Sequence, residues 1–191
     1  MKRAVKKDKV LVINILAKAF DDNQSVNYIV RQDDNREKRI RALMDYSFEV
    51  CNRFGEIWLG DDRKSCALIL YPHQKKITLV TVWLDIKLVC QALGLSGILK
   101  ALDRESKIQE KQPKEKMLYI WFIAVDPLCH KQGIGSLLLQ HLNARAQSIG
   151  LSVYLETSTP RNLPWYERYG FQIYDSLKLD YTLYFLKRST S

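Results

Sequence analysis

The sequence lacks any apolar run close to the roughly 18 residues that a membrane-spanning helix requires. We also expect no signal peptide, because the charged start MKRAVKK is not followed by an apolar region. No internal repeat and no low-complexity block interrupts the chain. These absences predict a cytoplasmic protein that has no membrane partner.

Cysteine is scarce, and its four positions are widely scattered. None of them forms a C-x-x-C pair beside histidines, so the spacing argues against a zinc site and we expect no metal. Disulfides are rare in a reducing compartment, so plain thiols are expected. The four residues are Cys51, Cys66, Cys90 and Cys129.

Acidic residues are too few to balance the basic ones. The chain has 21 Asp and Glu against 30 Lys and Arg, which gives a net charge of +9. This charge suits an anionic partner, whether nucleic acid, an acidic membrane surface or a phosphate-bearing cofactor. The basic residues are nevertheless spread along the chain and interrupted by acidic ones, as on a solvated surface. Because no nucleic-acid-reading motif is recognisable, we expect no specific nucleic-acid partner.

The chain does contain enough apolar sequence for one core. With 191 residues, 47% of them apolar, residues 1–191 are expected to form a single domain. Hydrophobic periodicity and turn residues predict a hairpin in the first half and alternating strands and helices in the second, which indicates an α/β or α+β fold with a sheet of mixed direction. Asp8 is predicted to cap the first helix, residues 27–34 to form a connection, and Gly55 to close the second helix in the left-handed manner. The predicted strands are 2–6, 56–59, 66–71, 119–125, 151–156, 171–174 and 181–186, and the predicted helices are 8–20, 35–54, 78–93, 96–110, 133–148 and 162–169.

One stretch in the second half joins a buried strand to a glycine-containing helix start. The apolar run from Tyr119 to Val125 is stopped by Asp126-Pro127, because proline cannot donate to a strand ladder. Gly133 and Gly135 then open a segment whose apolar residues recur at helical spacing. Free backbone N–H groups at a helix N-terminus attract phosphate and other anions. We therefore expect an anion-binding site here.

Three glycine-loop patterns compete for this helix start. A P-loop requires G-x-x-x-x-G-K-[ST], and neither that spacing nor the lysine is present. A dinucleotide-binding fingerprint would begin with Gly133 and Gly135 and would use Glu156 as its ribose-binding acid. However, Leu138 replaces its third glycine, and the glycines do not directly follow the strand. The third pattern, [Q/R]-x-x-G-x-[G/A], fits the chain except at His130.

The third pattern resembles the main cofactor motif of the GNAT superfamily of acyl-coenzyme-A-dependent N-acyltransferases. The matching residues are Trp121-Phe-Ile-Ala-Val-Asp-Pro127 and His130-Lys-Gln-Gly-Ile-Gly-Ser-Leu-Leu138. A second stretch, Tyr154-Leu-Glu-Thr-Ser158 followed by Asn162-Leu-Pro-Trp-Tyr-Glu-Arg-Tyr-Gly-Phe171, is similar to that family's later strand and Y-x-x-x-G-F segment, with wording closest to its puromycin-acetyltransferase-like branch. The resemblance implies a GNAT-like α/β (α+β) fold. Its mixed, mostly antiparallel central sheet of about six to seven strands would be flanked by helices and splayed at the 119–125 strand.

The resemblance also implies acetyl-CoA as the acyl donor and no metal. The pyrophosphate would lie against the N–H groups of the glycine loop, and the pantetheine arm would pair with the strand. The N–H of Ile123 would then be the oxyanion donor to the thioester oxygen. His130 stands where the family usually has Gln or Arg, which makes the charge at that position depend on pH. The implied cofactor-binding residues are Ile123, Ala124, Val125, His130, Lys131, Gln132, Gly133, Ile134, Gly135, Ser136, Asn162 and Tyr166.

Two residues are implied as catalytic. Tyr166 matches the general acid that protonates the departing thiolate, and its alternative role is that of a partly buried aromatic in a short helix. Glu156 lies at a strand end beside the expected cleft, where it would act as general base directly or through water, or else bind loop backbone by hydrogen bonds. The candidates for lining the acceptor pocket are Tyr119, Trp121 and Trp165, otherwise core residues, and His73, otherwise a surface residue.

The sequence therefore predicts an acetyl-CoA-dependent N-acyltransferase that acts as a monomer or homodimer. It would transfer the acetyl group to a primary amine of a small molecule by direct attack in a ternary complex. Two alternatives stay open: a sensor module that binds acyl-CoA without turnover, and an acetyltransferase that acts on a protein amine.

Overall fold

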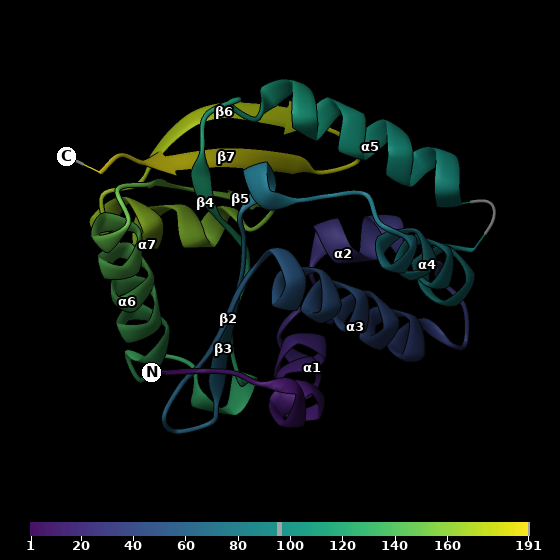
Figure 1. Ribbon diagram of the computed structural model, residues 1–191, viewed down its shortest axis with the longest axis horizontal. Helices are drawn as coiled ribbons and strands as arrows, with labels where there is room; N and C mark the ends of the chain where they lie inside the picture. The colour runs from purple at the N-terminus through teal and green to yellow at the C-terminus, as the bar shows by residue number, and fades with distance from the viewer. Residues whose placement is uncertain (95–96, 191) are drawn as a thin grey trace.

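The centre of the molecule is a seven-stranded sheet in the order β1-β2-β3-β4-β5-β7-β6. The computed structural model describes residues 1–94 and 97–190 (Figure 1). Among the strands in these ranges, β4 and β5 run parallel and every other neighbouring pair is antiparallel. The predicted mixed, mostly antiparallel sheet is therefore confirmed. The strands are β1 (Lys2–Arg3), β2 (Gly55–Leu59), β3 (Ser65–Leu70), β4 (Met117–Val125), β5 (Ser152–Thr157), β6 (Gln172–Lys178) and β7 (Thr182–Arg188).

Helices cover both faces of this sheet (Figure 1). On one face lie α1 (Lys9–Ala19) and α3 (Arg36–Phe54), and on the other lie α6 (Ile134–Ser148) and α7 (Leu163–Arg168). A further helix, α5 (Ile98–Lys111), packs over β6 and β7. The remaining helical segments are α2 (Gln24–Ile29), α4 (Leu79–Leu88), the π-helical turn η3 (Val89–Leu93), and the 3-10 turns η1 (Lys6–Asp8), η2 (Pro72–Gln74), η5 (Pro127–Cys129) and η6 (Pro160–Asn162).

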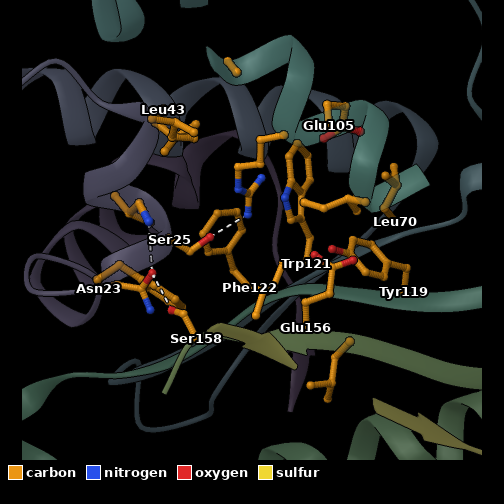
Figure 2. A pocket seen from close by; sticks show the side chains of 18 of the residues that line it. Asn23, Ser25, Leu43, Leu70, Glu105, Tyr119, Trp121, Phe122, Glu156 and Ser158 are labelled. Atoms are coloured by element: carbon orange, nitrogen blue, oxygen red, sulfur yellow. Dashed lines mark hydrogen bonds between the residues drawn. The ribbon is translucent and has the colours of Figure 1, made fainter. Parts of the chain in front are cut away.

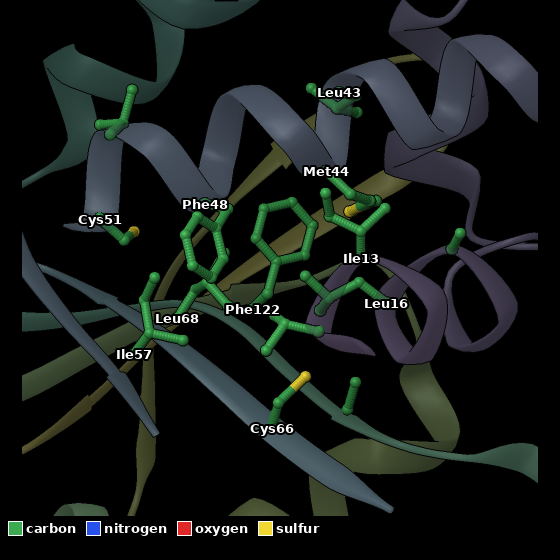
Figure 3. Packing of buried hydrophobic residues seen from close by; sticks show 14 of the residues in the cluster. Ile13, Leu16, Leu43, Met44, Phe48, Cys51, Ile57, Cys66, Leu68 and Phe122 are labelled. Carbon is green, nitrogen blue, oxygen red and sulfur yellow. The ribbon is translucent and has the colours of Figure 1, made fainter. Parts of the chain in front are cut away.

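The larger core fills the space between the sheet and the α1–α3 pair (Figure 3). Leu16 of α1 and Met44 and Phe48 of α3 are fully buried there, because apolar residues recur at three- and four-residue spacing on the inner side of each helix. They face Leu68 of β3 and Phe122 of β4. This packing fixes one face of β4 and leaves the strand's edge toward β5 for the site.

Strands β4 and β5 separate part of the way along their length. Residues 117–120 of β4 pair with residues 152–155 of β5, and β4 then continues to Val125 without a partner on that side in the described part of the chain. The register between β3 and β4 shifts at the same point, so that Trp121 is an extra residue in β4. Such a β-bulge bends a strand and increases its twist. The predicted splay at this strand is confirmed, and the bulge marks where it begins.

Three local predictions near the N-terminal half were wrong in detail. Part of the predicted connection 27–34 belongs to α2, whose first turn is capped because the Asn23 side chain accepts a hydrogen bond from the Val26 N–H at 3.0 Å. Gly55 is extended (φ −166°) and is the first residue of β2, so it does not end α3 in the left-handed conformation. Asp8 precedes α1 as predicted, but its carboxylate accepts from the Val5 N–H at 3.1 Å and does not cap that helix.

The helical segment before β4 is broken. The predicted helix 78–93 is α4 followed by the π-helical turn η3, and the predicted helix 96–110 is α5. The predicted start of that second helix, Ser96, lies outside the described residues. Within the described ranges, no single helix has the length and apolar character to cross a membrane, and one bent pair, 79–93 with 98–111, meets that test by length and composition.

Candidate functional site

The loop between β4 and α6 brings the chain into a concave turn ahead of the helix. The Asp126 side chain begins the turn by accepting a hydrogen bond from the Leu128 N–H at 3.1 Å. Lys131 (φ 62°) and Gly133 (φ 77°) are both left-handed, a conformation that glycine adopts without steric cost. No heavy atom lies within 4 Å of the place where a Gly133 Cβ would be. The turn therefore leaves open space directly in front of α6.

Six consecutive backbone N–H groups, from Lys131 to Ser136, donate to no acceptor among the described residues. The first backbone bond of the helix is donated by the Leu137 N–H to the Gly133 oxygen at 3.1 Å. The helix behind them has 15 residues, so its dipole places partial positive charge on these free donors. The geometry expected of an anion site is present, and the bound anion itself stays a prediction.

The exposed edge of β4 supplies a second set of free backbone groups. The Asp126 N–H donates to the Lys64 oxygen at 2.7 Å, so it points toward β3. Polar groups alternate along a strand, so those of Ala124 also point toward β3, whereas those of Ile123 and Val125 point into the gap beside β5. Of the three predicted strand residues, Ile123 and Val125 are thus the ones whose backbone can pair with a ligand in the gap.

His130 lies close to this edge. Its Nε2 is 3.2 Å from the carbonyl oxygen of Val125, and the side chain is exposed. The ring therefore contacts the Val125 carbonyl group, which points into the gap, and leaves the Val125 N–H free to donate to a ligand. Sequence reasoning had placed His130 at the loop, and the structure adds its contact with the strand.

A cavity of about 660 Å³ opens at the other end of the gap (Figure 2). Its walls come from α2, α4 and α5 on one side and from β4 and β5 on the other. Ile123, Glu156, Asn162 and Tyr166 all line it, so residues predicted from two separate stretches of the sequence meet at one site. The loop residues 130–136 do not line the cavity and lie beyond it along β4. The site therefore has two parts, a loop with free N–H groups and a cavity, joined by the free edge of β4.

Glu156 is the carboxylate at the floor of this cavity. Its Oε1 accepts a hydrogen bond from the Gln112 amide at 2.9 Å, and the side chain points toward Tyr119 (Figure 2). Burial raises the pKa of the Glu156 carboxyl to about 7, although the Gln112 amide and the charge of Arg104 oppose the rise. The side chain keeps partial access to the cavity. A carboxyl group with this pKa can take up and release protons near neutral pH.

Tyr166 lies across the cavity on α7. Its ring is buried between Trp165 and Phe171, with ring centroids 4.7 and 5.7 Å away. Gly170 (φ 83°) ends α7 and turns the chain back toward β6. Burial raises the pKa of the Tyr166 hydroxyl, so the group stays protonated and can donate. The Tyr166 hydroxyl donates to no acceptor among the residues described.

Three further charged side chains in the wall were not found from the sequence. Asp85 of α4 accepts a hydrogen bond from the Tyr46 hydroxyl at 2.7 Å. The charge of Glu105 of α5 contributes to raising the pKa of both Tyr46 and Glu156. Arg104 is held by the Tyr181 hydroxyl at 2.9 Å and the Ser25 hydroxyl at 2.6 Å. These residues come from helices whose place over the cavity depends on tertiary packing. Most positions of α5 are polar, so no local signal singled out residues 104 and 105.

Two of the four residues that were predicted to line the acceptor pocket do line the cavity. Tyr119 and Trp121 line the cavity, whereas Trp165 and His73 do not. Trp165 instead donates from its Nε1 to the Ser136 hydroxyl at 3.1 Å, which ties α7 to the start of α6. His73 is exposed in η2. Within residues 1–94 and 97–190, no cluster of three or more His, Cys, Asp or Glu side chains could hold a metal ion.

Comparison with known families gives one match over part of the chain. Residues 89–173 match the sequence model of the Acetyltransferase (GNAT) domain. This range contains β4, the glycine loop, α6, β5 and α7, which are the elements that build the site.

Solved structures give matches over the full length. A structure described as histone acetyltransferase HPA2 and related acetyltransferase from Corynebacterium glutamicum has a TM-score of 0.76 at 21% identity, covering 100% of this chain and 95% of that chain. The C-terminal condensation domain of Ebony, in complex with beta-alanyl-dopamine, has a TM-score of 0.67 at 8% identity, covering 98% and 96%. A mosquito arylalkylamine N-acetyltransferase like 5b has a TM-score of 0.56 at 14% identity, covering 98% and 97%. At these identities the likeness concerns the fold.

Proposed function

We propose that the chain transfers the acetyl group of acetyl-CoA to a primary amine of a small molecule, because residues 89–173 match the sequence model of the GNAT acetyltransferase domain and the chain is similar in fold to solved acetyltransferases. The transfer would be a direct attack in a ternary complex. The observation that carries the proposal is the row of six free N–H groups, which opens onto the unpaired edge of β4. A pyrophosphate and an amide-rich arm need these two features side by side.

The residues present fit acetyl-CoA. The N–H groups from Lys131 to Ser136 would hold the pyrophosphate, and the open space at Gly133 lets it approach the backbone. The Ile123 and Val125 backbone groups would hold the pantetheine arm in the gap. When bound, acetyl-CoA supplies an acyl group activated as a thioester.

The chain's own groups then provide the proton transfers. Glu156 would accept a proton from the acceptor ammonium group, directly or through water, because its raised pKa matches that task. The Ile123 N–H would hold the carbonyl oxygen while the new C–N bond forms and the C–S bond breaks. Tyr166 would give its proton to the departing sulfur, since burial keeps the hydroxyl protonated, and would regain a proton from the attacking nitrogen, directly or through water.

The shape of the cavity favours a small-molecule acceptor over a protein amine. Helices α2, α4 and α5 close it on the side away from the sheet, and most of its lining side chains are apolar or aromatic. A compact amine with an apolar body can be enclosed there, whereas a protein chain needs an open groove along the surface.

Thiol release from acetyl-CoA across a panel of small amines, peptides and intact proteins tests the proposal. We expect release well above background with small apolar or aromatic primary amines and little with peptides. A chain that binds acetyl-CoA but releases no thiol above background with any acceptor would be a sensor, and the enzymatic proposal would be wrong.

The Tyr166→Phe variant tests the acid. We expect turnover to fall about a hundredfold with acetyl-CoA affinity unchanged, because the variant removes one proton donor and keeps the buried ring. Tyr169→Phe is the matched control. Tyr169 lies three residues after Tyr166 and does not line the cavity, so this variant should keep wild-type turnover. Wild-type turnover in Tyr166→Phe would remove the assigned role.

A further inference from the structure

Helix α4 exposes a continuous stripe of large apolar side chains. Leu79 is 92% exposed, Trp83 63%, Ile86 50% and Val82 43%, and these residues recur at three- and four-residue spacing. They are called the apolar stripe below. Soluble surfaces rarely present several such residues together unless the patch has a partner.

The apolar stripe does not serve the cavity or the core. The opposite side of α4 does both: Leu84 and Thr81 are buried, and Asp85 lines the cavity. The helix therefore has two apolar sides. The rest of the chain covers the side with Leu84, and the apolar stripe is left exposed. In Figure 1, α4 lies at the edge of the molecule farthest from α6, with its outer side unobstructed by the drawn elements.

Basic side chains border the stripe. Lys75 and Lys76 precede α4, are exposed, and form no ion pair with any residue that the structure describes. Lys87, on the flank of the helix, pairs with Asp45 at 2.9 Å. No carboxylate belongs to the stripe itself, and the whole chain carries a net charge of +9.

From these contacts we propose that α4 docks on an anionic lipid surface through the apolar stripe, with Lys75 and Lys76 against the headgroups. Apolar and tryptophan side chains beside lysines are the composition of helices that lie in the plane of a membrane interface. This is peripheral docking, and it departs from the absence of a membrane partner that the sequence had predicted. It is independent of the proposed activity.

A second copy of the chain fits this face less well. A twofold contact through α4 would join two molecules that each carry a net charge of +9 and therefore repel each other. A single projecting helix also needs a groove on a protein partner, whereas a lipid surface needs no such shape. The charge and the shape therefore favour lipid.

Flotation with vesicles tests the docking. The full chain is mixed at low salt with vesicles of phosphatidylcholine, alone or containing about one third phosphatidylglycerol. We expect binding to the anionic vesicles that weakens as salt rises, and little binding to the neutral ones. Trp83 is the exposed one of the four tryptophans, so bound protein should show a blue-shifted emission that Trp83→Phe abolishes.

Two pairs of matched variants separate the apolar and the charged contributions. Leu79→Glu should reduce binding at least tenfold, whereas Val10→Glu, which changes an exposed apolar residue of α1 by the same charge, should reduce it far less. The double variant Lys75→Gln with Lys76→Gln should lose about thirtyfold in affinity for anionic vesicles. Its control, Lys6→Gln with Lys7→Gln, removes the same charge from an exposed pair elsewhere.

Leu79 is the first residue of α4, where a glutamate suits the helix dipole, so Leu79→Glu is expected to fold. An unchanged melting temperature checks this. Equal binding by Leu79→Glu and Val10→Glu, or equal binding to neutral and anionic vesicles, would overturn the proposal. A concentration-dependent dimer that Leu79→Glu dissociates, without vesicle binding, would assign the face to a second copy instead.

Discussion

Replacing Gly133 by alanine would have a different effect from replacing Gly135, because the two positions differ in backbone conformation and in their neighbours. Any other residue at Gly133 would be strained by its positive φ, so its replacement confounds folding with binding. A Cβ on Gly135 would lie 3.5 Å from Val125 Cγ2 and 3.7 Å from Trp165 Cζ2, which are ordinary contacts. That methyl would narrow the space between β4 and α7, through which the pantetheine arm is proposed to run.

We therefore expect Gly135→Ala to bind acetyl-CoA about tenfold more weakly and to keep the wild-type melting temperature. Calorimetric titration and a thermal melt measure the two quantities. Gln140→Ala, on the exposed side of the same helix, should leave both unchanged. A lower melting temperature with unchanged affinity would place the importance of Gly135 in folding.

Glu156 gives the activity its expected pH dependence. As a base it must be deprotonated, so the rate should rise with pH through about 7, the pKa to which burial raises this carboxyl. Glu156→Gln should lower turnover by roughly a hundredfold or more and remove this limb of the pH–rate profile. Gln112→Leu should move the limb to higher pH, because the Gln112 amide lowers the pKa of Glu156. An unchanged limb in Glu156→Gln would assign it to another group.

The same carboxyl supplies a folding control. Its folded pKa is above its unfolded one, so its contribution to stability falls as pH rises between the two. Glu156→Gln should therefore be more stable than the wild type above about pH 7. Lost turnover together with gained stability would exclude unfolding as the cause.

At the scale of elements, an ion pair with a buried carboxylate ties β2 to α6. The Glu56 carboxylate is 3% exposed and accepts hydrogen bonds from Arg145 at 2.7 and 3.2 Å and from Trp58 at 2.9 Å. Burial alone would raise the pKa of Glu56, but the Arg145 and Trp58 hydrogen bonds and nearby positive charges outweigh it and hold that pKa below its usual value. The pair thus anchors the helix whose first turn carries the free N–H groups.

Glu56→Gln should lower the free energy of unfolding by about 2 kcal/mol at neutral pH, because Arg145 loses its charged acceptor. A depressed folded pKa contributes stability above the unfolded pKa and loses it as pH falls through the folded one. The difference between variant and wild type should therefore shrink in acid. Urea unfolding at several pH values measures it, with the exposed Glu110→Gln as control. A pH-independent difference would indicate a packing effect.

The sequence located those parts of the site that are encoded locally. The loop from His130 to Ser136 and the helix after it follow from glycine spacing and apolar periodicity, and both are present. Trp121 as a bulge was not predictable, because strand periodicity assumes regular alternation and a bulge breaks it. Helix α2 was missed because six residues are too short for hydrophobic periodicity to show.

The cavity wall depends on contacts between distant parts of the chain. Asp85 and Glu105 lie on α4 and α5, and Gln112 directly follows α5, but their sequence does not show which polar positions line the cavity. Their direction is fixed only when α4 and α5 pack over the sheet. Loop and strand backbone were therefore predictable, whereas the side chains that set the pKa of the base and the shape of the cavity were not.

At the scale of the whole molecule, two parts of the sheet are joined through a short parallel contact. Strands β1 to β4 and strands β5 to β7 meet where residues 117–120 pair with residues 152–155, and the strands diverge beyond this point. A ligand lying in the gap would contact both parts. Binding should therefore stabilise the molecule as a whole.

At about 100 times its dissociation constant, acetyl-CoA should add about 2.7 kcal/mol to the stability of the folded state. For a chain of this size that corresponds to a rise in melting temperature of about 5–10 °C. Hydrogen exchange should show new protection at Ile123, at Val125 and in the loop 131–136, with α1 unchanged. ATP, which carries phosphates but no pantetheine arm, should protect the loop and not the strand edge. Equal protection of that edge by ATP would mean that the pantetheine arm does not lie along β4.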